Sequence, residues 1–221
     1  MRHLGKTETK LAIFDTFKTK ENDLTGEAIR QRNILGILAS NTNPADRTRT
    51  GIAQIIAKEQ GISWKNIYSG IFKDFDEVFL PLEIVQEEGR LPLHRGPKAL
   101  QEKGIPYYKI SKKGILICLS IKEIKKRDEL FKEFFRDLEN EFEQVLESLM
   151  KVSPNFAYSI LQKYVKAYCN KELPDLLPFD LRKLKQISDD SLVIQKEILV
   201  AFAKLSKQDR EDAIDFLEKI T

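Results

Sequence analysis

The stretch Ile52–Ile71, IAQIIAKEQGISWKNIYSGI, decides how the front of this chain folds. Its isoleucines recur at helical spacing on both sides of Gly61, which predicts two short helices joined by a tight turn at that glycine. We expect the first helix over Thr50–Gln60. We expect the second to begin at Ser63, which is a favourable N-cap residue, and to bury the isoleucines that follow.

Three residues of this stretch occupy the positions that a helix-turn-helix needs. Ala57 lets the helices approach, Gly61 makes the turn and Ile67 anchors the second helix. Such a motif presents the outer face of its second helix to the major groove of DNA, where asparagine pairs with adenine and lysine meets guanine or phosphate. A solvated helix face has the same composition and is the alternative. The residues concerned are Lys65, Asn66 and Ser69. The rings of Trp64 and Tyr68 are expected to pack within the protein and not to stack on DNA bases.

Composition indicates an ordinary globular protein. The 221 residues are 42% hydrophobic and 32% charged, which is enough for one core or two small ones. No apolar run approaches the roughly 20 residues of a membrane span, and the first residues do not resemble a secretory signal. Both Cys118 and Cys169 lie in apolar segments, so we expect buried free thiols and a cytoplasmic protein. With two histidines besides, we expect neither a metal site nor a cofactor.

The net charge of +3 conceals an asymmetry between the two halves of the chain. Residues 1–126 hold 22 Lys+Arg and 15 Asp+Glu, whereas residues 127–221 hold 15 and 19, so that +7 and −4 give the total. The front half therefore suits an anionic partner better than the back half does.

Around the central stretch, the front half shows a consistent order of elements. Residues 1–23 form an N-terminal arm with one apolar patch at Leu11–Phe17, which fits either a strand or an arm packed on the core. Thr25 is expected to cap a helix that runs to about Ser40. The second helix of the central pair is expected to continue to about Phe79, before Pro81.

Two short strands and a basic loop follow the central pair. Ile84–Glu87 and Pro106–Ile110 are the expected strands. Ser111 is expected to cap a helix, although Ile115–Ile121 also fits a strand; we prefer the helix. The basic residues of the loop between the strands are Arg90, Arg95, Lys98 and Lys103.

The order of these elements resembles a winged helix-turn-helix domain of the transcription-regulator type. The resemblance covers about Leu24–Ile121 and depends on the GIS turn, the strand LEIVQEE and the segment YYKISKKG. The distance from Ser63 to Ile84 is about one helical turn longer than is usual, which affects the wing boundaries. The resemblance implies a mainly α fold, with a small β-hairpin wing over the 24–121 domain and an all-α region at 122–221.

The resemblance also implies which residues would contact DNA. Arg47 and Arg49 lie near the first helix of the motif, and the wing supplies phosphate contacts. The segment Arg95-Gly96-Pro97 is similar to the centre of an AT-hook, whose second arginine is missing here. His94 is expected to be a wing or surface residue. The candidate DNA-binding residues are Arg47, Arg49, Ser63, Lys65, Asn66, Ser69, Arg90, Arg95 and Lys98.

The back half has a helical pattern throughout. A single long helix is expected over Ser120–Val152, with an apolar stripe that includes Phe134 and Phe142. Pro154 opens a further helix to Cys169, a proline-punctuated connection follows, and two last helices are expected at 189–204 and 207–220. Ser206 and Asp209 form the expected capping box of the last helix. We expect a homodimer held through Ile121–Val152, although later helices of the same chain offer an alternative cover for this stripe.

Two functions fit this sequence. The first is a DNA-binding transcriptional regulator whose C-terminal helices supply dimerisation and whose effector, if it has one, is not indicated. The second is a protein–protein interaction adaptor that uses a winged helix without DNA. Neither a glycine-rich phosphate loop before a helix nor a GxSxG motif is present, so we expect no enzymatic activity. Acidic residues near the basic face, such as Asp76, Glu87 and Glu88, would favour the adaptor.

Overall fold

The computed structural model of the protein describes residues 9–93, 103–136, 148–179, 181–187 and 189–220. The described part is mainly helical and contains two small antiparallel sheets of two strands each. The chain divides into two compact units, the first ending at Phe179 and the second beginning at the next residue.

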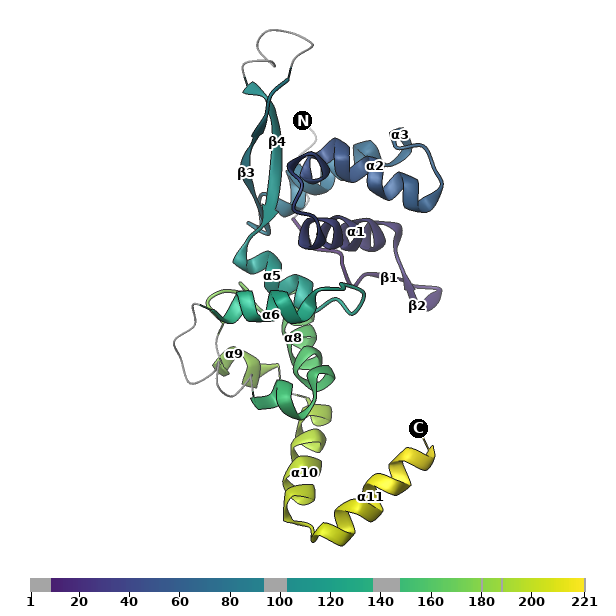
Figure 1. Ribbon diagram of the computed structural model, residues 1–221, viewed down its shortest axis with the longest axis vertical. Helices are drawn as coiled ribbons and strands as arrows, with labels where there is room; N and C mark the ends of the chain where they lie inside the picture. Colours follow the sequence, from purple (N-terminus) through teal and green to yellow (C-terminus); the bar gives the residue numbers. More distant parts are fainter. Residues whose placement is uncertain (1–8, 94–102, 137–147, 180, 188, 221) are drawn as a thin grey trace, which may run out of the picture. The chain divides into compact units, whose positions relative to one another are not determined.

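The first unit contains two hairpins and a set of helices (Figure 1). Its elements are β1 (Thr16–Phe17), β2 (Lys20–Leu24), α1 (Gly26–Ser40), η1 (Pro44–Arg47), α2 (Arg49–Gln60), α3 (Lys65–Asp74), η2 (Phe75–Phe79), β3 (Val85–Leu91), β4 (Ile105–Ile110), α5 (Lys112–Leu119), α6 (Arg127–Phe135) and α8 (Pro154–Cys169).

Helices α1, α2 and α3 share one apolar core. The hydroxyl of Thr25 accepts a hydrogen bond from the Ala28 amide and caps α1, as predicted. Thr48 caps α2 in the same way, through the Gly51 amide. The side chains that fill the core are fully or almost fully buried; they include Ile34, Leu35, Ile52, Ile56, Ile71 and Phe75.

A buried polar network joins the N-terminal arm to this core. The carboxylate of Asp74 is 1% exposed and accepts hydrogen bonds from Arg30 and Gln31. Gln31 in turn accepts one from the Ala12 amide at 2.9 Å. The predicted apolar patch is thus packed on the core around Ile13, whereas its far end at Phe17 is exposed and pairs within the β1–β2 hairpin.

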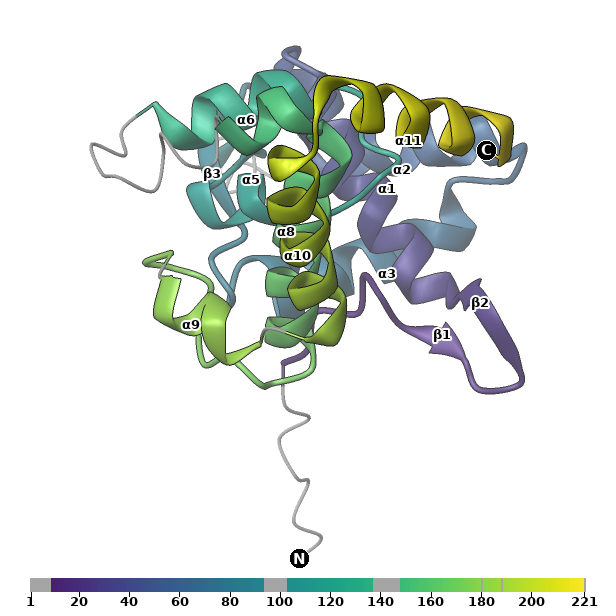
Figure 2. The same ribbon diagram turned by 90° about the horizontal axis from the view of Figure 1, so that it is seen from below.

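The strands β3 and β4 form a hairpin that stands beside α1 and α2 (Figure 1). Ser111 follows β4, and its hydroxyl accepts from the Gly114 amide, which caps α5. The predicted helix is therefore correct, and the alternative strand at Ile115–Ile121 is wrong. Every residue of α5 from Gly114 onward is buried, because α5 packs against both α6 and α8 (Figure 2).

The long helix predicted over Ser120–Val152 is wrong at its beginning. The chain forms turns at 120–126, and α6 begins at Arg127. Ile121 and Ile124 are buried within those turns, which explains why the apolar spacing continued to look helical. The residues 137–147, which include Phe142, lie outside the described residues.

The predicted apolar stripe is covered within the chain over 121–135, whereas Val152 at its far end is 62% exposed. Phe131, Phe134 and Phe135 are each at most 5% exposed. Phe131 contacts Tyr158 of α8 edge to face, at 6.4 Å between ring centroids. Helices α5, α6 and α8 pack together in the first unit. The domain boundary expected after Ile121 stays a prediction that residues 24–121 fold separately from the residues that follow.

Both cysteines lie in the first unit as buried free thiols, as predicted. Burial raises the pKa of Cys118 far above its ordinary value, and burial together with Asp15 raises the pKa of Cys169 to about 12. Both thiols are therefore protonated and unreactive near neutral pH.

The second unit contains α9 (Leu181–Gln186), α10 (Asp190–Lys204) and α11 (Lys207–Ile220). The last two helices agree with the sequence prediction. The predicted cap at Ser206 is confirmed, since its hydroxyl accepts from the Asp209 amide at 3.2 Å. Arg210 donates to the carbonyls of Ala203 and Leu205 and so closes the C-terminal end of α10.

Candidate nucleic-acid interface

The turn between α2 and α3 has the geometry that the sequence predicted. Gly61 has a φ of 65°, in the left-handed region that side chains rarely adopt, and it ends α2. The following amide, of Ile62, donates to the carbonyl of Ala57 at 3.0 Å. A residue with a Cβ would be strained here by its backbone conformation alone, since open space surrounds the site of the missing side chain.

The start of α3 differs from the prediction. Ser63 does not cap the helix with its side chain; α3 begins at Lys65, and Trp64 precedes it in a helical conformation. Ser63 contributes its carbonyl, which accepts from the Asn66 amide at 3.0 Å. The first turn is held instead by the Trp64 ring, which packs edge to face on Tyr68 at 5.2 Å.

The outer face of α3 carries side chains that the protein itself does not use. Lys65, Asn66 and Ser69 are all exposed. None of the three side chains has a hydrogen-bond or ion-pair partner among the described residues. These groups are therefore available to a partner, which is what a recognition face requires.

The predicted arginines are in a different situation, because each is bound to a carboxylate of the same chain. Arg47 pairs with Glu88 at 2.5 Å, Arg49 with Asp76 at 2.6 Å, and Arg90 with Glu87 at 2.6 Å. The side chains of Arg47 and Arg49 are only 13% and 14% exposed. The acidic residues that the sequence places near the basic face thus neutralise its arginines.

Arg49 is the most constrained of the three arginines. Its guanidinium forms two hydrogen bonds to Asp76 and a third to the hydroxyl of Tyr108, and it lies 4.8 Å from the ring centroid of Phe72. Burial alone would lower the pKa of Arg49, but the hydrogen bonds and charges of Asp76 and Tyr108 together outweigh it, and the pKa is raised. Arg49 consequently ties α2 to η2 and β4.

The β3–β4 hairpin is shaped by a bulge. Glu87 faces Tyr108 and Gly89 faces Tyr107, so that Glu88 is the extra residue of β3. The ring of Tyr107 lies over Gly89, where an added Cβ would be 2.6 Å from the tyrosine hydroxyl. The bulge turns Glu88 toward Arg47 and gives that arginine its partner.

A third extended segment joins this hairpin. Thr48, which lies between η1 and α2, forms an antiparallel bridge with Tyr107 of β4. The extended backbone at Thr48 therefore lies on one side of β4, and β3 lies on the other. This contact joins the start of α2 to the hairpin within the first unit.

The predicted wing residues Arg95 and Lys98, and also His94, lie outside the described residues. Among the described residues from Thr48 to Ile110, three lysines have no carboxylate partner. They are Lys58, Lys65 and Lys103. The available positive charge of this part of the chain is therefore carried by lysines, not by the arginines that the sequence favoured.

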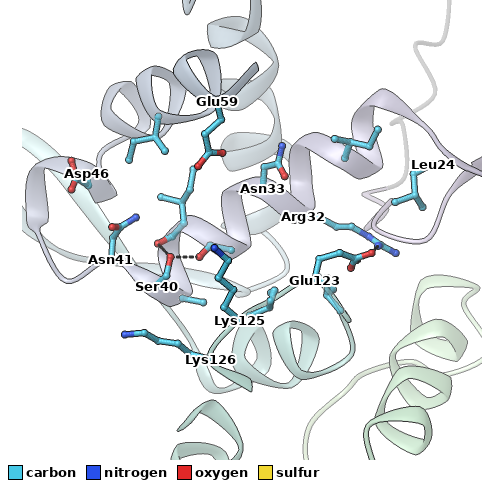
Figure 3. Close-up of a pocket in the computed structure, with 17 residues that line it drawn as sticks. Leu24, Arg32, Asn33, Ser40, Asn41, Asp46, Glu59, Glu123, Lys125 and Lys126 are labelled. Atoms are coloured by element: carbon cyan, nitrogen blue, oxygen red, sulfur yellow. Dashed lines mark hydrogen bonds and ion pairs between the residues drawn. The ribbon is translucent and has the colours of Figure 1, made fainter. Parts of the chain in front are cut away.

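A separate cavity of about 690 Å³ lies between α1, the end of α2 and the turns at 121–126 (Figure 3). Glu59 enters it from α2, and Lys125 approaches from the opposite side. Arg32 and Glu123 pair at one end at 3.0 Å. The cavity was not predicted from the sequence, because its lining joins residues 24–59 to residues 121–126, which are far apart in the chain.

Comparisons of the chain with protein-family models, with curated protein sequences and with solved structures found no match. In the described part of the chain, no three His, Cys, Asp or Glu side chains are gathered where they would hold a metal ion. The described helices include none with the length and apolar character needed to cross a membrane.

Proposed function

We propose that this protein is a DNA-binding transcriptional regulator that presents α3 and the β3–β4 hairpin to duplex DNA. The observation that carries the proposal is the exposed face of Lys65, Asn66 and Ser69, which follows a left-handed turn at Gly61 and has no partner within the described chain. A helix held in this way against a preceding helix is the arrangement that enters a major groove.

The chain topology supports the same proposal. Thr48, before α2, forms an antiparallel bridge with Tyr107 of β4, and the β3–β4 hairpin follows α3 and η2. This order agrees with the resemblance of residues 24–121 to a winged helix-turn-helix domain and supports the proposal.

The proposed contacts follow from the chemistry of the free side chains. Asn66 would pair with an adenine edge, and Lys65 would contact guanine or a phosphate. Lys103, which precedes β4 at the loop end of the hairpin, would approach the DNA backbone together with the predicted wing residues Arg95 and Lys98. Arg47, Arg49 and Arg90 would position these elements through their carboxylate partners and would not contact phosphates directly.

One observation favours the alternative, a protein–protein interaction adaptor. The carboxylates of Asp76, Glu87 and Glu88 divide the basic face and neutralise its three arginines. A partner protein with mixed charge tolerates such a surface better than a polyphosphate does. The adaptor therefore remains the second candidate.

Binding of the full chain to a fluorescently labelled random duplex library, measured by anisotropy at two salt concentrations, tests the proposal. We expect binding that weakens steeply with salt, with a log–log slope of about 0.9 for each neutralised phosphate. Lys65→Ala with Asn66→Ala should reduce affinity at least tenfold, which corresponds to about 1.4 kcal/mol. Lys73→Ala is the matched control, because Lys73 lies in the last turn of α3 beside Glu77. Absence of binding at low salt would favour the adaptor.

A further inference from the structure

The second unit leaves an unusual amount of apolar surface uncovered. α10 has no buried residue, although it is rich in apolar residues on all sides. A helix of this composition is found inside a larger assembly, because water is an unfavourable neighbour for it. The large apolar residues of α10 and α11 that are more than a third exposed are Val193, Ile194, Ile198, Leu199, Val200, Leu205, Ile214, Phe216 and Leu217.

Two of the most exposed residues of α10 belong to a regular stripe. Ile194, Ile198, Ala201 and Leu205 follow one another at spacings of four, three and four residues, and we call this stripe the α10 seam. Ile194 is 54% exposed and Ile198 is 60% exposed. Alternating spacings of three and four are the spacings at which two helices pack along a common line, and the small Ala201 permits a close approach.

We propose that the α10 seam is the interface of a homodimer, in which α10 of a second copy of this chain packs against it in the antiparallel direction. The spacings of four, three and four residues are the same from either end of the seam. An antiparallel copy therefore places Ile194 near Leu205 of the second copy, and Ile198 near Ala201. A two-fold axis repeats each of these contacts.

Charge selects the antiparallel direction. Glu197 and Lys204 flank the same side of the seam, seven residues apart, and neither has an ion-pair partner among the described residues. In an antiparallel dimer, Glu197 lies opposite Lys204 of the second copy, and the two-fold axis makes this pair twice. A parallel dimer would instead place the two copies of Glu197 on opposite sides of the seam, so that Glu197 would have no lysine opposite it.

Two further quantities agree with a second copy as the partner. Ile194 and Ile198 are 54% and 60% exposed, so the seam offers apolar surface that a second copy can bury. Residues 181–220 hold eight Lys+Arg and eight Asp+Glu, so net repulsion does not oppose self-association of this unit. The inference does not depend on DNA binding, and it replaces the 121–152 stripe as the dimer surface.

Light scattering of the full chain, coupled to size exclusion across a range of concentrations, tests the proposal when the charges of Glu197 and Lys204 are reversed singly and together. The wild-type chain should be a dimer at micromolar concentration. Glu197→Lys and Lys204→Glu should each raise the dissociation constant about tenfold or more, because each converts two attractive pairs into two repulsive ones. The double variant should recover to within a few-fold of wild type, since it restores opposite charges across the interface.

Two other variants keep the test decisive. Lys196→Glu is the matched control, because it makes the same charge change as Lys204→Glu on the face of α10 that lies opposite the seam. It should leave the dimer unchanged. Ile198→Glu should give monomers whose circular dichroism still shows full helix content. A wild-type chain that is monomeric at high micromolar concentration would overturn the proposal. So would a dimer that survives Ile198→Glu, or single reversals that the double variant does not rescue.

Discussion

Two apolar stripes in this protein have the same helical spacing and opposite surroundings. In α6, Phe131 and Phe134 are almost completely buried, because α5 and α8 of the same unit cover them. In α10, Ile194 and Ile198 are more than half exposed. Periodicity thus indicates that a face needs cover, but it does not indicate which part of the chain, or which other chain, supplies that cover.

The two stripes also contribute to different free energies, one to folding and the other to the proposed association. The first unit obtains its stability from side chains buried within one chain, at about 25 cal/mol per Å² of apolar surface. The second unit leaves much of its apolar surface exposed, and the proposed dimer would bury part of it. Substitutions in α6 should therefore act on folding, whereas substitutions in the α10 seam should act on the oligomeric state.

The largest effect is expected in the covered stripe. Phe134 is 1% exposed and lies against Phe135 and Lys112, so Phe134→Ala removes a large side chain from a closed core. We expect it to lower the free energy of unfolding by about 3–5 kcal/mol. Urea denaturation followed by circular dichroism measures this loss. A change below about 1 kcal/mol would show that α6 does not belong to the stable core of the first unit.

A smaller effect is expected at a position where burial plays no part. Gly61→Val places a β-branched side chain at a φ of 65°, and we expect a loss of about 1–2 kcal/mol or more from backbone strain. Gly36→Ala is the control, because Gly36 lies inside α1 with open space around the missing Cβ and no positive φ. It should be neutral or stabilising, by about 0.5–1 kcal/mol. Equal midpoints in thermal denaturation of the two variants would contradict the left-handed turn.

The smallest effect is expected in the uncovered stripe, under conditions that separate folding from association. Ile198→Ala should change the unfolding free energy of the dilute monomer by less than about 0.5 kcal/mol, because the side chain is 60% exposed. Denaturation at nanomolar concentration, monitored by fluorescence, checks this value. A loss as large as that of Phe134→Ala would mean that the same chain already covers the seam, and the comparison between the two stripes would no longer hold.

Much of the local structure was predictable, because it depends on residues that are close in sequence. The caps at Thr25, Ser111 and Ser206 each join a side chain to an amide three residues later. The turn at Gly61 follows from a single residue type. The cap predicted at Ser63 failed because packing of Trp64 on Tyr68 holds the first turn of α3 and leaves the serine hydroxyl unused.

The helix predicted through 120–126 failed for a related reason. Because α5 and α6 pack against each other, the chain must turn between them, and the Ser120 hydroxyl donates to the Ile117 carbonyl where α5 ends. Ile121 and Ile124 are buried in either conformation, so apolar spacing did not distinguish a turn from a helix.

Most of the helices, the caps at Thr25, Ser111 and Ser206, the turn at Gly61 and the free thiols follow from the sequence, because they depend on near neighbours and on local hydrophobic spacing. Which charges remain available depends on the tertiary structure. Arg30 reaches Asp74 across 44 positions, and Arg49 reaches Asp76 across 27. Ion pairs of this kind form between residues that folding brings together, so a count of basic residues overstates the arginine charge of the candidate interface. Because the arginines are paired, Lys65 is its central available cation.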